Sequence, residues 1–145
     1  MKYSEVKQVK EFCNNLFSTP DWKEVIKNAC WYENDFTVDN VRFIASAEID
    51  SVLADELGND KYMLGCFNAQ FIADVIGIDT DVIEAMQEAE AFEAIGKLII
   101  SMNKLEELAS AYASADGYGH HFNGYDFSEE EVKVNGVSYY VFDNH

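Results

Sequence analysis

The chain contains 145 residues, of which 48% are hydrophobic and 14% aromatic, and its formal net charge at pH 7 is −17. This apolar content is enough for one compact core and excludes a charged disordered tail. We therefore expect a single domain spanning residues 1–145. The sequence predicts neither a signal peptide nor a membrane span, so we expect a soluble protein of the cytoplasm.

The cysteines exclude a disulfide framework. Cys13, Cys30 and Cys66 are odd in number, far apart and free of C-x-x-C spacing, which also argues against a structural zinc site. We expect three reduced thiols.

The acidic residues are distributed unevenly along the chain. Residues 1–32 hold five lysines against four carboxylates, whereas residues 33–145 hold 23 carboxylates against five cations, a net of −18. The chain thus has a near-neutral N-terminal segment, predicted to be helical, and a strongly acidic body. A field of this sign repels nucleic acid and anionic membranes and attracts basic surfaces. We expect a protein partner with a basic surface, and no direct binding of nucleic acid or membrane.

Apolar periodicity predicts helices in the first half of the chain. Hydrophobic residues recur at three- and four-residue steps in two successive segments, which are expected to start at Ser4 and at Thr19–Pro20. Ser46 is expected to cap a third helix, and Gly58 to end it in the left-handed region.

Two segments predict β-hairpins. Residues 36–44 contain short β-branched and aromatic runs around Asp39–Asn40, and residues 132–142 contain similar runs around Asn135–Gly136. Asn-Gly is a strong hairpin signal because both central residues of the turn take positive φ. Paired with each other, the hairpins would form a small antiparallel sheet against the helices. The sequence therefore predicts a mostly helical α+β domain with a C-terminal β-hairpin.

Residues 70–83 have the pattern of a helix-turn-helix. Ala73 is small where the helices would cross, and Gly77 follows four residues later for the tight turn. The second helix fails as a reader of DNA, because it has no arginine or lysine to neutralise a phosphate or read a guanine edge. We interpret the segment as two helices that meet at a glycine corner, the second of them acidic: Asp79, Asp81, Glu84, Glu88 and Glu90.

Three of these carboxylates are expected to form a row. Asp81, Glu84 and Glu88 are spaced at i, i+3 and i+7, so they share one helix face. The opposite side is a stripe that predicts one helix through Ile100, with core residues Val82, Ile83, Met86, Ala89, Phe92, Ile95, Leu98 and Ile99. A fixed row of carboxylates could imitate a ladder of DNA phosphates, and the plainer alternative is a solvated helix face. Further acidic residues that could join the contact are Asp50, Asp55 and Glu56.

The segment Asp116–Asp126 is a glycine-rich, aromatic loop that is too apolar to be a mere linker. Tyr118, Phe122 and Tyr125 are candidate anchors for a second, less electrostatic contact with the partner.

The same segment carries a family resemblance. Residues 112–126 and 140–143 resemble the C-terminal signature of small acidic proteins encoded by tailed phages and prophages, and residues 62–68 and 83–86 are similar to the same family. No activity is established for that family, so the resemblance implies no catalytic residue. It implies a context, since small acidic phage proteins are often inhibitors of host restriction or CRISPR nucleases, some of them DNA mimics.

Two chemical alternatives involve the cysteines and histidines. Cys66 precedes an expected helix start at residues 67–70, and His120 or His121 with Asn123 or Asp126 follows in the order of a papain-like triad. The surroundings of Cys66 lack the small polar residues that would open it to substrate. His145 and Asp116 could join the loop histidines around a metal, but adjacent histidines have no diagnostic ligand spacing.

We therefore expect a non-enzymatic protein without catalytic residues, metal or cofactor. Its expected function is to bind a basic surface of a host nucleic-acid enzyme, as an anti-restriction or anti-CRISPR inhibitor that could act as a DNA mimic. The alternative is a small cysteine hydrolase that uses Cys66. The sequence leaves open the target and the oligomeric state, a homodimer included.

Overall fold

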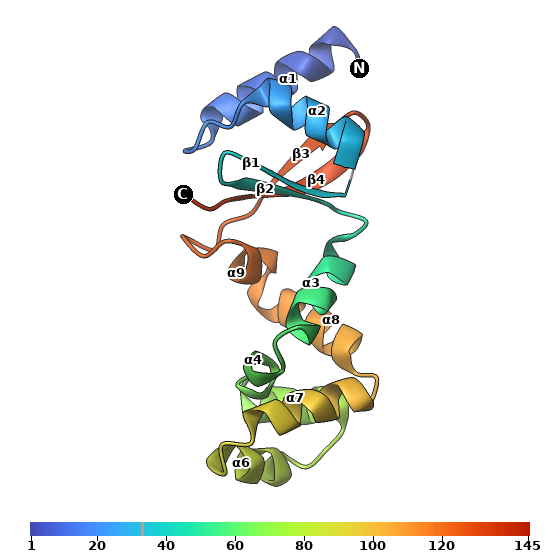
Figure 1. Ribbon diagram of the computed structural model, residues 1–145, viewed down its shortest axis with the longest axis vertical. Coiled ribbons are helices and arrows are strands. Elements are labelled where there is room, and N and C mark those ends of the chain that lie inside the picture. Colours follow the sequence, from blue (N-terminus) through green and yellow to red (C-terminus); the bar gives the residue numbers. More distant parts are fainter. Residues whose placement is uncertain (33) are drawn as a thin grey trace. The chain divides into compact units, whose positions relative to one another are not determined.

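The structure is a computed structural model and describes residues 1–32 and 34–145 (Figure 1). It confirms a mostly helical α+β fold with an antiparallel sheet that includes a C-terminal β-hairpin. The chain divides into two compact units: unit 1 comprises Met1–Ile49 and Asp116–His145, and unit 2 comprises Asp50–Ala115. None of the helices in the described ranges has the length and apolar content needed to cross a membrane.

Unit 1 is a four-stranded sheet with helices packed against it. The strands follow the order β1-β2-β4-β3, and all neighbours are antiparallel. The helices α1 and α2 cover one face of the sheet, as Figure 1 shows, and bury Val9, Cys13 and Val25 in one cluster with Phe43 and Tyr139. The elements are α1 (Tyr3–Asn15), α2 (Trp22–Tyr32), β1 (Asp35–Val38), β2 (Val41–Ala45), α9 (Tyr118–Phe122), β3 (Glu130–Val134) and β4 (Val137–Asp143).

Both predicted hairpins are confirmed. Asp39 and Asn40 have φ of 50° and 68°, and Asn135 and Gly136 have φ of 53° and 79°. Two consecutive positive φ values match the right-handed twist of the flanking strands, which is why the sequence signal was reliable.

Unit 2 is helical. Its interior is aliphatic, with Leu53, Leu64, Ile83, Ile95 and Leu108 almost completely shielded from solvent. The helices are α3 (Ile49–Gly58), α4 (Lys61–Gly65), α5 (Ala69–Ile76), α6 (Thr80–Glu88), α7 (Phe92–Ser101) and α8 (Leu105–Asp116).

Two glycines allow α4 and α7 to approach each other closely. A Cβ at Gly65 of α4 would lie 1.9 Å from the carbonyl oxygen of Phe92, and a Cβ at Gly96 of α7 would lie 2.1 Å from that of Lys61. Neither position has room for a side chain, because the obstacle on each side is backbone. The two helices therefore pack backbone to backbone at this crossing.

Three expected helix starts were wrong. Ser4 lies inside α1, and the side chain of Asp21, rather than Thr19, accepts the capping hydrogen bond at the start of α2, from the Lys23 N–H at 3.0 Å. The Ser46 N–H donates to the carbonyl of Ser138, which holds Ser46 on the sheet instead of at the start of α3. Gly58 ends α3 as expected, but not in the left-handed conformation. A Cβ there would come within 2.9 Å of Leu105 Cδ2, and a shift of the flexible leucine side chain could relieve this contact.

The single helix predicted through Ile100 is also wrong. The chain breaks it into α6 and α7 at Glu90, which has φ of 58°, and the Ala91 N–H closes the end of α6 on the Met86 carbonyl at 2.9 Å. Val82 and Ala89, expected in the core, are exposed. The stripe that predicted one long helix is therefore divided between two shorter ones.

The thiols differ in accessibility, and we predict that they will react in two classes. Burial, with a further contribution from the charge of Asp21, raises the pKa of Cys13 to about 11, whereas Cys30 and Cys66 are exposed. A thiol-specific reagent should modify Cys30 and Cys66 in the native protein and reach Cys13 only after denaturation, because the thiolate is the reactive form. Peptide mapping by mass spectrometry after timed labelling checks this. Native labelling of Cys13 at the rate of the others would contradict the α1–α2 packing.

Candidate functional site

The helix-turn-helix-like corner is present as geometry. The side chain of Asn68 caps α5 by accepting from the N–H groups of Gln70 and Phe71, at 3.0 and 3.2 Å. Gly77 then takes the left-handed conformation at φ 75°, and the carboxylate of Asp79 caps α6 by accepting from the Asp81 N–H at 2.9 Å. Asp79, predicted as a partner contact, therefore has a structural role in starting α6.

The inner side of α6 is anchored at two points. Ile83 is completely buried, and the side-chain amide of Gln87 donates to the carbonyls of Gly65 and Phe67, at 3.0 and 2.8 Å. Charge-free hydrogen bonds of this kind contribute about 0.5–1.5 kcal/mol each and fix the rotation of the helix about its axis. Sequence reasoning missed Gln87, since nothing in its neighbours along the chain signals a partner twenty residues away.

The outer side of α6 presents the predicted row. Asp81, Glu84 and Glu88 are all exposed, and none forms an ion pair with a lysine or arginine within the described part of the chain. Successive turns of a helix are about 5.4 Å apart, so the carboxylates follow one another at roughly that interval. Val82 is 47% exposed and lies beside the row with Ala85, giving the acidic face an apolar margin.

Unit 2 as a whole is strongly negative. It contains 13 aspartates and glutamates against three lysines, a formal charge of −10. Two of those lysines form ion pairs with nearby carboxylates, Lys97 with Glu93 at 3.8 Å and Lys104 with Glu107 at 3.3 Å. The field around α6 is therefore left largely uncompensated by the protein itself.

The acidic residues of α3 do not extend the row. Asp50, Asp55 and Glu56 are at or near the surface, but a helix turns about 100° per residue, so these three side chains point in different directions around α3. Of the predicted acidic contacts, the structure aligns those of α6 and separates those of α3.

The aromatic loop is more ordered than a linker. It contains the short helix α9, and the buried side chain of Asn123 closes the turn that follows. Asn123 Nδ2 donates to Asp126 Oδ1 and to the Ser128 carbonyl, both at 2.9 Å, while its Oδ1 accepts from the Tyr125 N–H at 3.0 Å. The hydroxyl and N–H of Ser128 also donate to Asp126, and these bonds hold the pKa of that carboxyl below its usual value.

The three predicted aromatic anchors have different positions. Phe122 is only 5% exposed and packs between Phe142 and the Arg42 guanidinium, so the expectation that it contacts a partner was wrong: it is a core residue. Tyr118 is half-buried against Tyr140. Tyr125 is 64% exposed, and its ring lies against that of His145, with centroids 4.0 Å apart.

A clasp near the end of the chain links distant segments of unit 1. The Ser18 N–H and hydroxyl donate to the two oxygens of Asp143, at 3.0 and 2.5 Å, and His145 Nδ1 lies 3.3 Å from the same carboxylate. The His145 ring stacks on Phe17, with ring centroids 4.0 Å apart. Burial alone would raise the pKa of Asp143, but the bonds from Ser18 and the nearby His145 outweigh it and lower this pKa.

The elements of the hydrolase alternative lie in separate units. Cys66 belongs to unit 2, where it ends α4. A helix does start within residues 67–70, because α5 begins at Ala69, but the N–H groups of Gln70 and Phe71 donate to the side chain of Asn68. His120 and His121 belong to α9 of unit 1, and His120 packs on Phe127 at 4.9 Å. Among the residues that the structure describes, no three histidine, cysteine or acidic side chains gather closely enough to hold a metal ion.

Comparison of the chain with protein-family models, with curated proteins and with solved structures gives no match. The candidate site is therefore defined by its own geometry. It is an exposed row of carboxylates on α6, whose opposite side is held by the buried Ile83 and by the hydrogen bonds of Gln87.

We predict that Asp143→Ala will destabilise the protein more at pH 7 than at pH 3. Because the pKa of Asp143 is lowered in the folded state, its contribution is present above the unfolded pKa of about 3.9 and is lost as pH falls through the folded value. Loss of the Ser18 bonds should lower the free energy of unfolding by about 1–3 kcal/mol at pH 7. Urea unfolding at both pH values measures it. Asp116→Ala, at an exposed carboxylate, is the control, and an equal loss at both pH values would contradict the ionic clasp.

Proposed function

We propose that this protein is a phage-type inhibitor that binds a basic surface of a host nucleic-acid enzyme and competes with its nucleic acid. The observation that supports the proposal is the exposed row Asp81, Glu84 and Glu88 on α6, with no compensating cation among the described residues. A restriction or CRISPR effector nuclease is the expected class of target, because its cleft is built to bind phosphates.

The electrostatics favour a basic protein over any anionic partner. A chain of charge −17 is repelled by DNA, whose two strands together carry one negative charge per about 1.7 Å of helix axis. A cleft lined with lysine and arginine attracts it instead, and such steering raises association rates by about 10–1,000-fold at low salt. The same charge therefore selects the partner and accelerates the encounter.

Rigidity makes a row of carboxylates a better imitation of phosphates than a flexible acidic tail. The cap at Asp79, the buried Ile83 and the two bonds from Gln87 hold α6 in one orientation before binding. Less conformational entropy is then lost on association. Val82, exposed beside the row, could add an apolar contact that a nucleic acid backbone lacks.

The resemblance to small acidic phage proteins supports the same context. The resemblance assigns no role to any residue, so the proposed contact is argued from α6 alone. Cysteine hydrolysis remains the alternative, in which Cys66 would be the nucleophile, but no observation in unit 2 gives Cys66 a base or an activating helix start.

We predict that neutralising the row separates binding from folding. In Asp81→Asn/Glu84→Gln/Glu88→Gln, relief of like-charge repulsion should stabilise α6 by about 0.2–0.5 kcal/mol per pair. Loss of the favourable Asp81 charge at the start of α6 should destabilise the helix by about 0.3–1 kcal/mol, so the two effects oppose each other. Stability should thus change by less than about 1 kcal/mol. Displacement of DNA from restriction or CRISPR effector complexes should fall at least tenfold relative to the wild type.

The matched control is Glu129→Gln/Glu130→Gln/Glu131→Gln. It makes the same change in net charge at three exposed residues of unit 1 and should displace DNA as well as the wild type. The wild-type protein alone should not retard duplex DNA in a gel. If the α6 variant and the control variant displaced DNA equally well, the row would be only a solvated surface and not the contact site.

The Cys66→Ala variant distinguishes binder from hydrolase. The thiol is exposed, so its removal leaves no cavity, and we expect unchanged stability and full inhibition of the target enzyme. Inhibition and urea unfolding are measured on the same preparation. A folded Cys66→Ala protein that has lost all activity would favour the cysteine hydrolase.

A further inference from the structure

One face of α1 forms a groove with the first residue of α2. Its lining recurs at three- and four-residue steps along α1, so these side chains form one stripe, and Trp22 lies beside them. The groove has a volume of about 300 Å³. We call it the α1 groove, and it is lined by Tyr3, Val6, Lys7, Lys10, Glu11, Asn14 and Trp22.

The surface around the α1 groove is cationic and aromatic. The helices α1 and α2 carry Lys7, Lys10, Lys23 and Lys27, and the lysines of these helices form no ion pair with any described carboxylate. The Lys10 and Lys23 ammonium groups lie 5.7 and 5.6 Å from the centroid of the Trp22 ring. Val6 and Trp22 give the groove an apolar floor, and its margin carries Lys7 and Lys10 with one carboxylate, Glu11.

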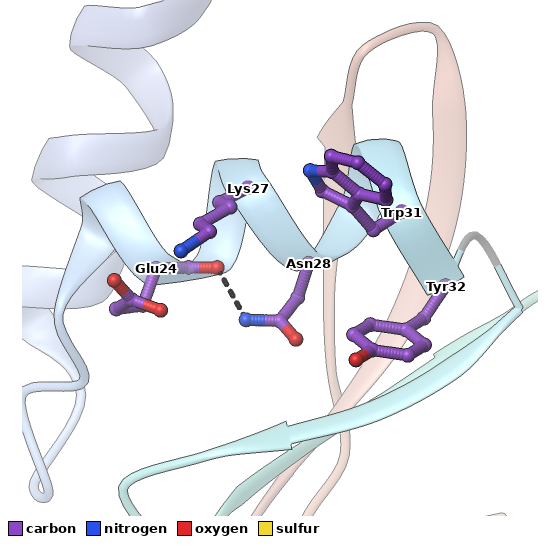
Figure 2. Close-up of a pocket in the computed structure, with 5 residues that line it drawn as sticks. All are labelled: Glu24, Lys27, Asn28, Trp31 and Tyr32. Carbon is purple, nitrogen blue, oxygen red and sulfur yellow. Dashed lines mark hydrogen bonds between the residues drawn. The ribbon is translucent and has the colours of Figure 1, made fainter.

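A second hollow lies on α2. It has a volume of about 220 Å³ and is lined by Glu24, Lys27, Asn28, Trp31 and Tyr32, as Figure 2 shows. The side chains of Trp31 and Tyr32 are 77% and 67% exposed. The α1–α2 pair of this strongly acidic chain thus carries exposed aromatic rings together with unpaired lysines.

The groove has the chemistry to hold a short acidic helix with an apolar margin, and the chain itself carries one. We propose that the α1 groove binds helix α6 of a second copy of this chain. The carboxylates of Asp81, Glu84 and Glu88 then face the lysines, and Val82 and Ala85 lie against the apolar floor. Binding of an amphipathic helix in a groove is a common mode of recognition.

Charge complementarity favours this occupant over other contacts between copies. The attraction is local: residues 1–32 carry +1 and include the unpaired Lys7, Lys10 and Lys23, whereas unit 1 as a whole carries −7, unit 2 carries −10 and two whole chains of −17 repel each other at long range. Two acidic units facing each other would repel. The contact joins different surfaces of the two copies, so it can extend from one copy to the next or close into a ring.

Self-association of this kind would cover the row that the target needs. Only this consequence rests on the proposed function, because the contact between copies stands on the charges and the groove alone. Self-association and target binding would then compete, and the concentration of the protein would regulate its own inhibitory activity.

Charge exchange tests the contact. One variant is Lys7→Glu/Lys10→Glu/Lys23→Glu, and the other is Asp81→Lys/Glu84→Lys/Glu88→Lys. By sedimentation velocity at about 0.15 M salt, where the Debye length is about 8 Å and screens the repulsion between whole chains more than the close charge pairs, the wild type should associate, and at about 1 M salt, where it is about 3 Å, it should sediment as one chain. Each variant alone should have a dissociation constant at least tenfold higher, whereas an equimolar mixture of the two should associate.

Controls separate the contact from folding and from net charge. Circular dichroism checks that each variant is folded, and Lys7→Gln/Lys10→Gln/Lys23→Gln and Asp81→Asn/Glu84→Gln/Glu88→Gln replace any variant that is not. Glu129→Gln/Glu130→Gln/Glu131→Gln should associate like the wild type. A wild-type monomer at about 0.15 M salt, or variants that associate alone and gain nothing on mixing, would overturn the proposal. If the copies associate as expected but the wild-type protein does not displace DNA from the effector complexes, the proposed function is contradicted and the contact between copies is supported.

Discussion

The backbone packing of α4 against α7 at Gly65 and Gly96 is the constraint on which the rest of unit 2 depends. A Cβ at either position would overlap a carbonyl oxygen of the opposite helix, so α4 and α7 keep their spacing only while both residues are glycine. The carbonyl of Gly65 also accepts from Gln87, which links this crossing directly to α6. The orientation of the acidic row is thus set by the packing of two helices that carry none of its charges.

The contacts of α6 with the rest of unit 2 explain why the helix forms despite the repulsion between its carboxylates. Three like charges on one face would weaken the helix in isolation, where nothing offsets their repulsion. In the protein, Ile83 is completely buried and Gln87 makes two bonds to α4 and its end, so tertiary contacts hold the helix. The burial of one aliphatic side chain contributes about 1.5–3 kcal/mol, which exceeds the repulsion within the row. Packing stabilises the fold, and the charged face is left available for a partner.

Features that depend on neighbouring residues were predictable from the sequence, and features that depend on distant ones were not. The turns at Asp39–Asn40 and Asn135–Gly136 and the corner at Gly77 follow from local backbone preferences. The need for glycine at Gly96 arises from a backbone more than thirty residues away in the sequence. The break at Glu90 was missed because its positive φ is unusual for glutamate, and the apolar stripe continues past it. For the site, spacing predicted the row itself, whereas the burial of Phe122 could not be read from an aromatic loop without periodicity.

The order of strands in unit 1 has a consequence for how the chain acquires its structure. The two central strands are β2 and β4, and residues 46–136 separate them in the sequence. The contacts of unit 2 are among residues 50–115, so this unit can form while β2 still lacks its neighbour. Closing so long a loop before the strands pair makes completion of the sheet a slow, late event. During synthesis on the ribosome, one edge of β2 therefore stays exposed until β4 emerges, and the N-terminal helices cover a half-built sheet until then.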